Sequence, residues 1–272
     1  MSYENFKPTI WSHFIQRELE KKCRLVDSCW KQFEGEVQHG KEVKILGVGS
    51  PTIGNYTGAS IGAPQAVTGN DVTLAINQAK FFNFGVDDVD KAQSVPGLME
   101  ALLKEATHKM AVARDSYIAS LAKGSQYYHD AGVITKSDEA KRALDKALLT
   151  LREHDVDLED DVVIEIAPFF YQLLRDELAA MKTNNDDLIA RGSVGMYDNC
   201  VVKLSNNLYE EDGVHHMMVR TKRAIAFAGQ IDSVEAYRPD DLFCDAVKGL
   251  NVFGAKIVRP KELCVIKVGK GD

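Results

Sequence analysis

The sequence predicts a mixed α+β protein, and three observations lead to this fold class. Several stretches place apolar residues three or four positions apart, which is typical of amphipathic helices. Others are short runs of alternating or β-branched apolar residues, which is typical of strands. The third is the run 45–70, which contains no Lys, Arg, Asp or Glu although 27% of all residues are charged. We therefore expect a charged globular protein that carries one unusual neutral segment.

Residues 8–33 carry large apolar side chains three or four positions apart, with charged residues between them. Part of this stretch is expected to be an amphipathic helix. It holds both tryptophans, Trp11 and Trp30. Large aromatic residues fill cores, but they also anchor interfaces, so both roles stay open for them.

Residues 42–46 and 71–76 each alternate like a β-strand, and the neutral, glycine-rich segment lies between them. This arrangement predicts a long hairpin-like loop whose stem is the two strands. A loop of this length is uncommon inside a compact domain and is usually functional or mobile.

Residues 94–123 form the clearest predicted helix. Ser94 is a suitable N-cap, Pro96 suits the first turn, and Gly124 follows the last residue, Lys123. At 1.5 Å per residue the helix would be roughly 40 Å long, which suits the spine of an extended molecule.

The remaining sequence alternates between predicted helices and strands. A helix is expected to be capped by Ser137, and a second to open at Pro168. Strands are expected in the following places: 161–166, 200–204, within 219–239, 255–260 and 263–268.

Composition limits the functional classes. The formal net charge of −7 argues against a protein whose main task is to grip nucleic acid, because such binding needs Lys and Arg to neutralise phosphates. The sequence contains no apolar run of transmembrane length and no secretory signal pattern at its N-terminus. Its five cysteines form no CxxC pair, which is typical of reduced thiols in a cytoplasm.

Motifs for chemistry are weak or missing. The glycine segment has Thr52 where a dinucleotide fingerprint needs its third glycine, and it lacks a P-loop lysine. The acidic run 153–161 departs from a calcium loop at Asp160 and Ile166. No histidine or cysteine spacing matches a metal or nucleophile signature. We therefore expect no catalytic residue, no cofactor and no metal.

The order of the segments resembles that of the major capsid proteins of tailed bacteriophages, whose fold is shared with herpesviruses and encapsulin shells. The resemblance is carried by FKPTIWSHFIQRELEKKCRLVDSC, GKEVKILGVGSPTIGNYT and VTLAINQAKFFNFGVDDVDKAQS in the first half. In the second half it is carried by IEIAPFFYQLL, RGSVGMYDNCVVKLSNNL and AFAGQIDSVEAYRPDDLFCDAVKGLNVFGAKIVRPKELCVIKV. No single piece is a signature, but together they span nearly the whole chain.

The resemblance implies an anatomy of four parts. Residues 1–36 would be an N-terminal arm and 37–80 an extended loop. Residues 81–130 and 226–272 would form a peripheral domain with the spine helix 94–123, and 131–225 an axial domain. The neutral loop would lie across a neighbouring subunit, since burying an uncharged segment costs little desolvation. The candidate subunit contacts are Trp11, Phe14 and Trp30 in the arm, and Ile53, Tyr56 and Ile61 in the loop.

The resemblance also implies a function. The chain would self-assemble through pentamers and hexamers into an icosahedral shell around a viral double-stranded DNA genome. A separate scaffolding protein and a portal would be partners, and packaged DNA would be touched only weakly and without sequence specificity. Assembly would take place in the bacterial host cytoplasm, the mature location would be the virion capsid, and no membrane would be involved.

Two departures from the family pattern bear on this expectation. Some members form a covalent cross-link through a loop lysine, but the tip of this loop has none, so no such cross-link is expected there. Many members carry a long N-terminal scaffolding segment. This chain begins almost at the arm, so scaffolding would come from another protein or from a cleaved precursor.

Three other functions compete with this one. An encapsulin-like compartment would hold protein cargo instead of a genome. An enzyme with a mobile loop would form a small oligomer and would have a pocket lined with titratable groups. A peripheral membrane protein would need a basic amphipathic helix, which the sequence lacks.

Overall fold

The computed structural model describes residues 23–32, 42–45, 53, 55, 71–87, 98–156, 161–180, 195–241 and 243–271. The helices among them are α3 (Leu98–Ser120), α4 (Ser137–Glu153) and α5 (Pro168–Ala180), with short 3-10 turns at Val26–Ser28, Leu121–Gly124 and Pro260–Glu262. The strands are β1 (Glu42–Ile45), β2 (Val72–Ala75), β3 (Gln78–Asp87), β4 (Tyr128–Ile134), β5 (Val162–Ile166), β6 (Met196–Tyr197), β7 (Cys200–Leu204), β8 (Tyr209–Glu211), β9 (Val214–Thr221), β10 (Ile225–Tyr237), β11 (Cys244–Ile257) and β12 (Leu263–Lys270). This confirms the predicted α+β class.

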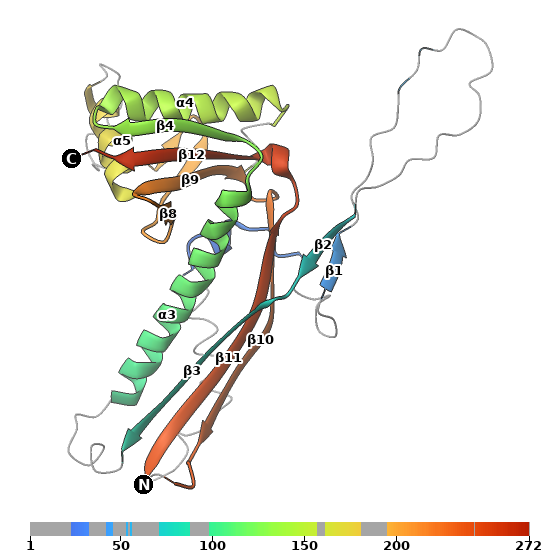
Figure 1. Ribbon diagram of the computed structural model, residues 1–272, viewed down its shortest axis with the longest axis vertical. Coiled ribbons are helices and arrows are strands. Elements are labelled where there is room, and N and C mark those ends of the chain that lie inside the picture. The colour runs from blue at the N-terminus through green and yellow to red at the C-terminus, as the bar shows by residue number, and fades with distance from the viewer. Residues whose placement is uncertain are drawn as a thin grey trace.

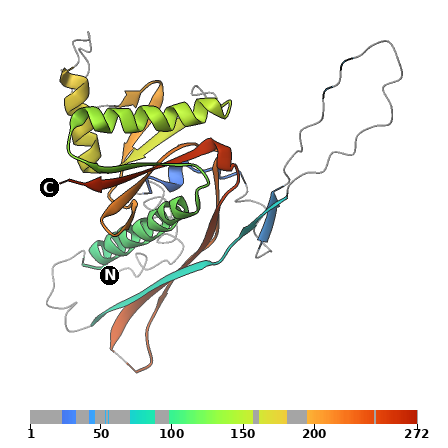
Figure 2. The same ribbon diagram turned by 45° about the horizontal axis from the view of Figure 1, so that its top comes forward.

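The described residues form three sheets, and the seven-stranded mixed one is here called the larger sheet. Its order is β4-β12-β9-β5-β7-β6, and β8 pairs with β9. The pairs β12–β4 and β5–β7 are parallel, whereas β9 is antiparallel to both β12 and β5. Helices α4 and α5 cover one face, and α3 approaches the other (Figures 1 and 2).

The central strands β9 and β12 are apolar on both faces, as expected of strands covered on both sides. Met217 and Cys264 belong to the core beneath α4 and α5. Their chain neighbours Met218 and Val265 belong to the core on the α3 side. This alternation follows from the pleat of the strands and places a separate apolar cluster on each face of one sheet.

Helix α4 packs closely on the sheet because its buried stripe is partly alanine, including Ala140, Ala143 and Ala147. The predicted cap at Ser137 is wrong. Ser137 is the first helical residue, and its hydroxyl donates a hydrogen bond of 2.7 Å to Glu177 of α5. The Glu139 carboxylate instead accepts bonds from the backbone N–H groups that precede the helix.

The second sheet is long and antiparallel, in the order β10-β11-β3. Strand β11 has 14 residues, which at about 3.3 Å each spans roughly 45 Å. Helix α3 runs beside this sheet (Figure 1). Met110 and Ile118 of the helix share a core cluster with Phe227 and Phe253 of the sheet. The predicted long helix is thus confirmed over Leu98–Ser120 and ends in the 3-10 turn at Gly124, while its expected start at residues 94–97 lies outside the described residues.

Strand β12 continues the chain from the long antiparallel sheet into the seven-stranded sheet. It follows β11 after a short 3-10 turn and pairs with both β4 and β9 in the seven-stranded sheet. The sequence-based division grouped residues 226–272 with the spine helix. Strand pairing instead groups β12 with the strands of 131–225.

Strands β1 and β2 pair antiparallel in the register Glu42↔Ala75, so the predicted stem of the hairpin is present. Apolar residues of the stem, including Val43 and Leu74, form a cluster with Ala226 and Ala228 of β10. The stem also crosses β11 at Gly254, where an added Cβ would lie 2.2 Å from the carbonyl oxygen of Ala75. Small residues therefore let the stem lie directly on the long sheet.

We predict that Gly254→Ala lowers the free energy of unfolding by about 1–3 kcal/mol, because the new methyl group forces two backbone segments apart. Gly229→Ala on the adjacent strand is the matched control. A Cβ there would meet only the Phe227 ring, at 3.8 Å, so we expect little change or a slight gain. Urea denaturation measures both variants, and equal effects would contradict the crossing as the cause.

Candidate assembly surfaces

Residues 23–32, here called the anchored segment, are held to the body of the protein by buried polar groups. Asp115 of α3 is 1% exposed. Its carboxylate accepts three backbone hydrogen bonds from the first turn of the anchored segment. The donors are the N–H groups of Arg24 at 3.0 Å, Leu25 at 3.1 Å and Val26 at 3.3 Å. Burial raises the pKa of the Asp115 carboxyl, and these three N–H groups oppose the shift.

Arg220 of β9 holds the same turn from the sheet side. Its guanidinium donates to the carbonyl oxygens of Leu25 and Ser28. It also donates two hydrogen bonds, of 3.0 and 2.7 Å, to the carboxylate of Glu165 on β5. Both charged side chains are fully buried. Burial opposes the charge on Arg220, but the Glu165 carboxylate outweighs it and raises the pKa of the guanidinium.

The far end of the anchored segment joins β10. Trp30 donates its backbone N–H to Ile225 at 2.9 Å and accepts from Phe227 at 3.0 Å, forming a parallel bridge at Ala226. Its indole N–H donates to Gln32 at 3.1 Å, and the half-buried ring lies 5.7 Å from the Arg259 guanidinium. Trp30 is thus held by its own chain, and its role in subunit contact stays a prediction.

Of the other five predicted contact residues, the structure describes one. Ile53 is described, and its side chain is 94% exposed. An isoleucine so exposed is available to a partner surface, but no contact is shown. Trp11, Phe14, Tyr56 and Ile61 lie outside the described residues. The subunit contacts of all six residues therefore stay predictions.

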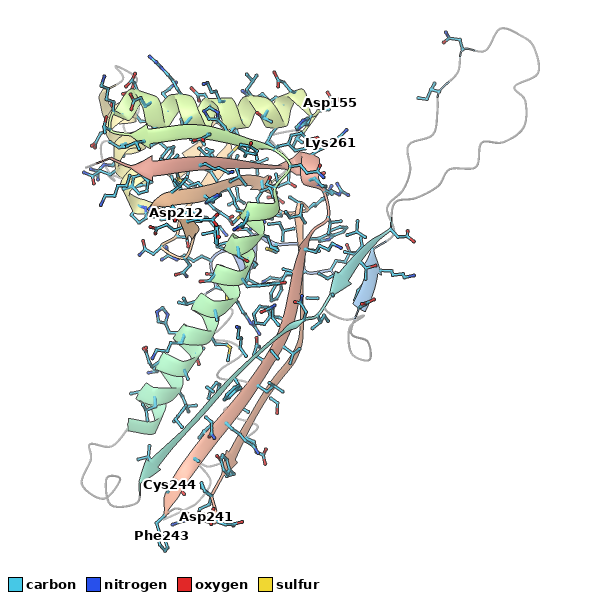
Figure 3. All side chains as sticks on the ribbon, viewed as in Figure 1. Asp155, Asp212, Asp241, Phe243, Cys244 and Lys261 are labelled. Carbon is cyan, nitrogen blue, oxygen red and sulfur yellow. The ribbon has the colours of Figure 1, made fainter. Side chains whose placement is uncertain are left out.

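Further exposed apolar residues were missed by the sequence-based reasoning. Phe81 of β3 is 78% exposed and faces Leu250 across the β3–β11 pair, beside a recess of about 390 Å³. Phe243, at the tip of the long sheet, is 82% exposed (Figure 3). Val133 is 67% exposed on β4, an edge strand of the larger sheet. The run Phe81-Phe82 was the available signal, since adjacent residues of a strand face opposite sides.

Groups for chemistry are sparse in the described part of the chain. There, no set of three or more His, Cys, Asp or Glu side chains is placed to hold a metal ion. Burial raises the pKa of Cys29, Cys200 and Cys264 to about 11 each, so these thiols stay protonated near neutral pH. None of the described helices is long and apolar enough to cross a membrane.

Comparison with known proteins gives a consistent result for the fold. No family model and no curated protein matches the sequence. Among solved structures, one from Mycobacterium phage Che8 is similar, with 26% identity, 90% of each chain covered and a TM-score of 0.76. The capsid structure of cyanophage P-SCSP1u has 15% identity, covers 86% of this chain and 85% of its own, and gives a TM-score of 0.71. A virus-like particle from Pyrococcus furiosus has 10% identity, coverages of 95% and 98%, and a TM-score of 0.60.

The chain therefore has the capsid fold of the tailed-phage major capsid proteins, along nearly its whole length. The likeness extends over about nine-tenths of the chain. The fold expected from the order of the sequence segments is confirmed.

We predict that Arg220→Met lowers the free energy of unfolding by about 3–5 kcal/mol, because it leaves the Glu165 charge buried without a partner. The double variant Arg220→Met with Glu165→Leu removes both charges and should cost clearly less than the sum of the two single changes. Guanidinium denaturation measures the three variants. Additive losses would mean that the pair is not coupled.

We also predict that stability falls on acidification through the region of pH 6.5. Burial, and next the charge of Lys267, lowers the pKa of His216, whose Nδ1 is buried without a partner among the described residues. The unfolded chain therefore takes up this proton at a higher pH than the folded chain, so protonation favours unfolding. One such histidine contributes at most about 1.4 kcal/mol per pH unit.

Thermal unfolding between about pH 7.5 and pH 5.5 tests this dependence. His216→Phe keeps an aromatic ring next to Tyr209 and should flatten the slope. His129 has its pKa lowered in the same direction, by burial and by Lys146, so part of the slope should remain. A full slope in the His216 variant would contradict the assignment.

Proposed function

We propose that this chain is a major capsid protein that self-assembles into an icosahedral shell around a double-stranded DNA genome. The observation that carries the proposal is the match to phage capsid structures over most of both chains. Exposed apolar residues at several separate places, including Phe81, Val133 and Phe243, suit a subunit that makes contacts on many sides.

Each part of the chain then has a role in assembly. Residues 1–36 form the arm, 37–80 the extended loop and 81–130 the peripheral domain with α3. The strand pairing supports an axial domain that adds two pieces to residues 131–225: the first residues of β4, from Tyr128, and strand β12. Trp30 of the arm pairs with β10, and the stem of the loop packs on the same strand, which supports a common base for the two segments.

The proposal extends to partners and place. Assembly would proceed through pentamers and hexamers in the bacterial host cytoplasm, with a separate scaffolding protein and a portal, and the product would be the virion capsid. The net charge of −7 suits a wall that touches DNA only weakly. The protein would be structural and not an enzyme.

The second candidate is an encapsulin-like compartment, favoured by the likeness to an archaeal virus-like particle. The two functions differ in cargo. Particles purified from the native source would contain nuclease-protected DNA if the chain is a capsid protein, and a folded cargo protein if it is a compartment shell.

We predict that the purified full-length chain forms closed shells, tubes or rings, and that deleting residues 50–69 abolishes them. The loop is expected to contribute contact area to a neighbour, which deletion removes. Sedimentation velocity and negative-stain electron microscopy measure assembly. A variant with 50–69 replaced by a Gly-Ser segment of equal length controls for chain length, and it too should fail to assemble.

A wild-type chain that stays a small oligomer under crowding, with added scaffolding protein, would overturn the proposed function. A deletion variant that assembles like wild type would leave shell formation intact but would remove the loop from the mechanism.

A further inference from the structure

A basic recess lies at one side of the larger sheet, where α4 ends and β11 turns into β12. It has a volume of about 250 Å³ and is lined by groups that include Arg223, Arg259, Lys261, Asp155 and Glu262. We call it the basic corner. Its lining comes from three separate parts of the chain, so the recess is a product of the tertiary fold.

Some charged groups of the basic corner already have hydrogen-bond or ion-pair partners within the same subunit. Arg259 pairs with Glu262 at 2.8 Å, and the Thr221 hydroxyl donates to the same carboxylate. A ring nitrogen of His154 lies 3.2 Å from the carbonyl oxygen of Lys261. The side chains of Arg223 and Lys261 are exposed and have no hydrogen-bond or ion-pair partner among the described residues. Asp155, on the same rim, offsets one of these two charges.

An acidic turn lies on the opposite side of the same sheet, between β8 and β9. Asp212 and Gly213 both have positive φ, of 52° and 78°, as in a tight two-residue hairpin turn. Glu211 is paired with Lys123 at 2.7 Å. Glu210 and Asp212 are exposed, and the Asp212 carboxylate has no partner among the described residues. The turn therefore presents negative charge outward on a rigid backbone.

The acidic turn and the basic corner lie at opposite sides of the larger sheet. Figure 3 shows Asp212 on one side of the larger sheet and Asp155 and Lys261 on the other. Copies related by rotation about an axis make head-to-tail contacts, in which one side of each subunit meets the opposite side of the next. The acidic turn and the basic corner lie at opposite sides of the larger sheet, as such a head-to-tail contact requires.

We propose that the acidic turn at Glu210–Gly213 of one subunit enters the basic corner of the next subunit in a ring. This inference rests on the proposed function. The occupant is a second copy because the exposed charges are complementary in sign and few in number. Packaged DNA would call for a broad basic surface, whereas the corner also holds Asp155 and Glu262. Ion pairs at this position would set the register between neighbours.

A charge exchange tests the contact. The turn variant combines Glu210→Lys with Asp212→Asn, since asparagine tolerates the positive φ of that position. The corner variant combines Arg223→Glu with Lys261→Gln, which changes the net charge equally in the opposite direction. The combined variant carries all four changes and restores the net charge of wild type.

A control variant separates the contact from the effect of net charge alone. It combines Glu105→Lys with Asp241→Asn, which changes the net charge as much as the turn variant does. Both positions are exposed. Glu105 lies on α3, and Asp241 lies at the far tip of the long sheet, away from the acidic turn and the basic corner (Figure 3).

We expect the turn variant and the corner variant each to reduce the assembled fraction about tenfold or more at low salt, because like charges then meet. The combined variant should recover to within about twofold of wild type, and the control should stay within the same range. Assembly is measured by sedimentation velocity, and circular dichroism with thermal unfolding confirms that each variant is folded.

The possible outcomes separate the contact from the proposed function. If wild type assembles and the turn and corner variants assemble equally well, the contact is wrong but the shell function stands. If both variants fail and the combined variant also fails, the two sites bind something else, such as a scaffolding segment or DNA, and the contact is again overturned. If wild type forms no ring at all, the contact falls together with the proposed function.

Discussion

The buried ion pair between Arg220 and Glu165 is the interaction on which the rest of the structure depends. Two fully buried charges are costly unless their hydrogen-bonding capacity is used, and here the guanidinium also binds the carbonyl oxygens of Leu25 and Ser28. Asp115 binds the N–H groups of the same turn from the opposite side. The central sheet, the long helix and the anchored segment therefore meet at one polar junction.

This junction has a consequence for assembly. The anchored segment continues from it to Trp30, which pairs with the start of β10, and the stem of the hairpin packs on the next residues of that strand. Trp30 and the stem of the hairpin thus both contact the start of one strand, β10. Because Ala226, Ala228 and Gly254 carry little or no side chain, the stem lies close to the sheet and its direction is set by backbone contact.

The sequence predicted the elements whose patterns are local. Helix α4 and strand β1 were found because their buried residues recur with the expected period, and β2 was found from the apolar alternation of its sequence around the buried Leu74. Strand β4 was missed because most of its residues are exposed or half-buried, as suits an edge strand, and β3 was missed because Phe81 and Phe82 break the alternation. The cap at Ser137 was assigned from residue type, whereas tertiary contact with Glu177 determined its partner.

The polar junction and the basic corner were less predictable because they are formed by tertiary contacts between distant parts of the chain. Asp115 is 91 residues from Arg24, and Arg220 is 55 residues from Glu165, so no local pattern joins them. The available signal was a single charge inside an apolar strand, as in VVIEI and HHMMVRT, since a buried charge requires a partner. The basic corner was equally hidden, because its lining residues come from three separate parts of the chain.

The most direct test of this account is a cryo-electron microscopy reconstruction of particles formed by the full-length chain. The account predicts a closed icosahedral shell in which each subunit keeps its anchored segment clamped between Asp115 and Arg220, with its loop lying on a neighbouring subunit. A small closed oligomer with the loop folded back over a pocket of its own subunit would contradict it.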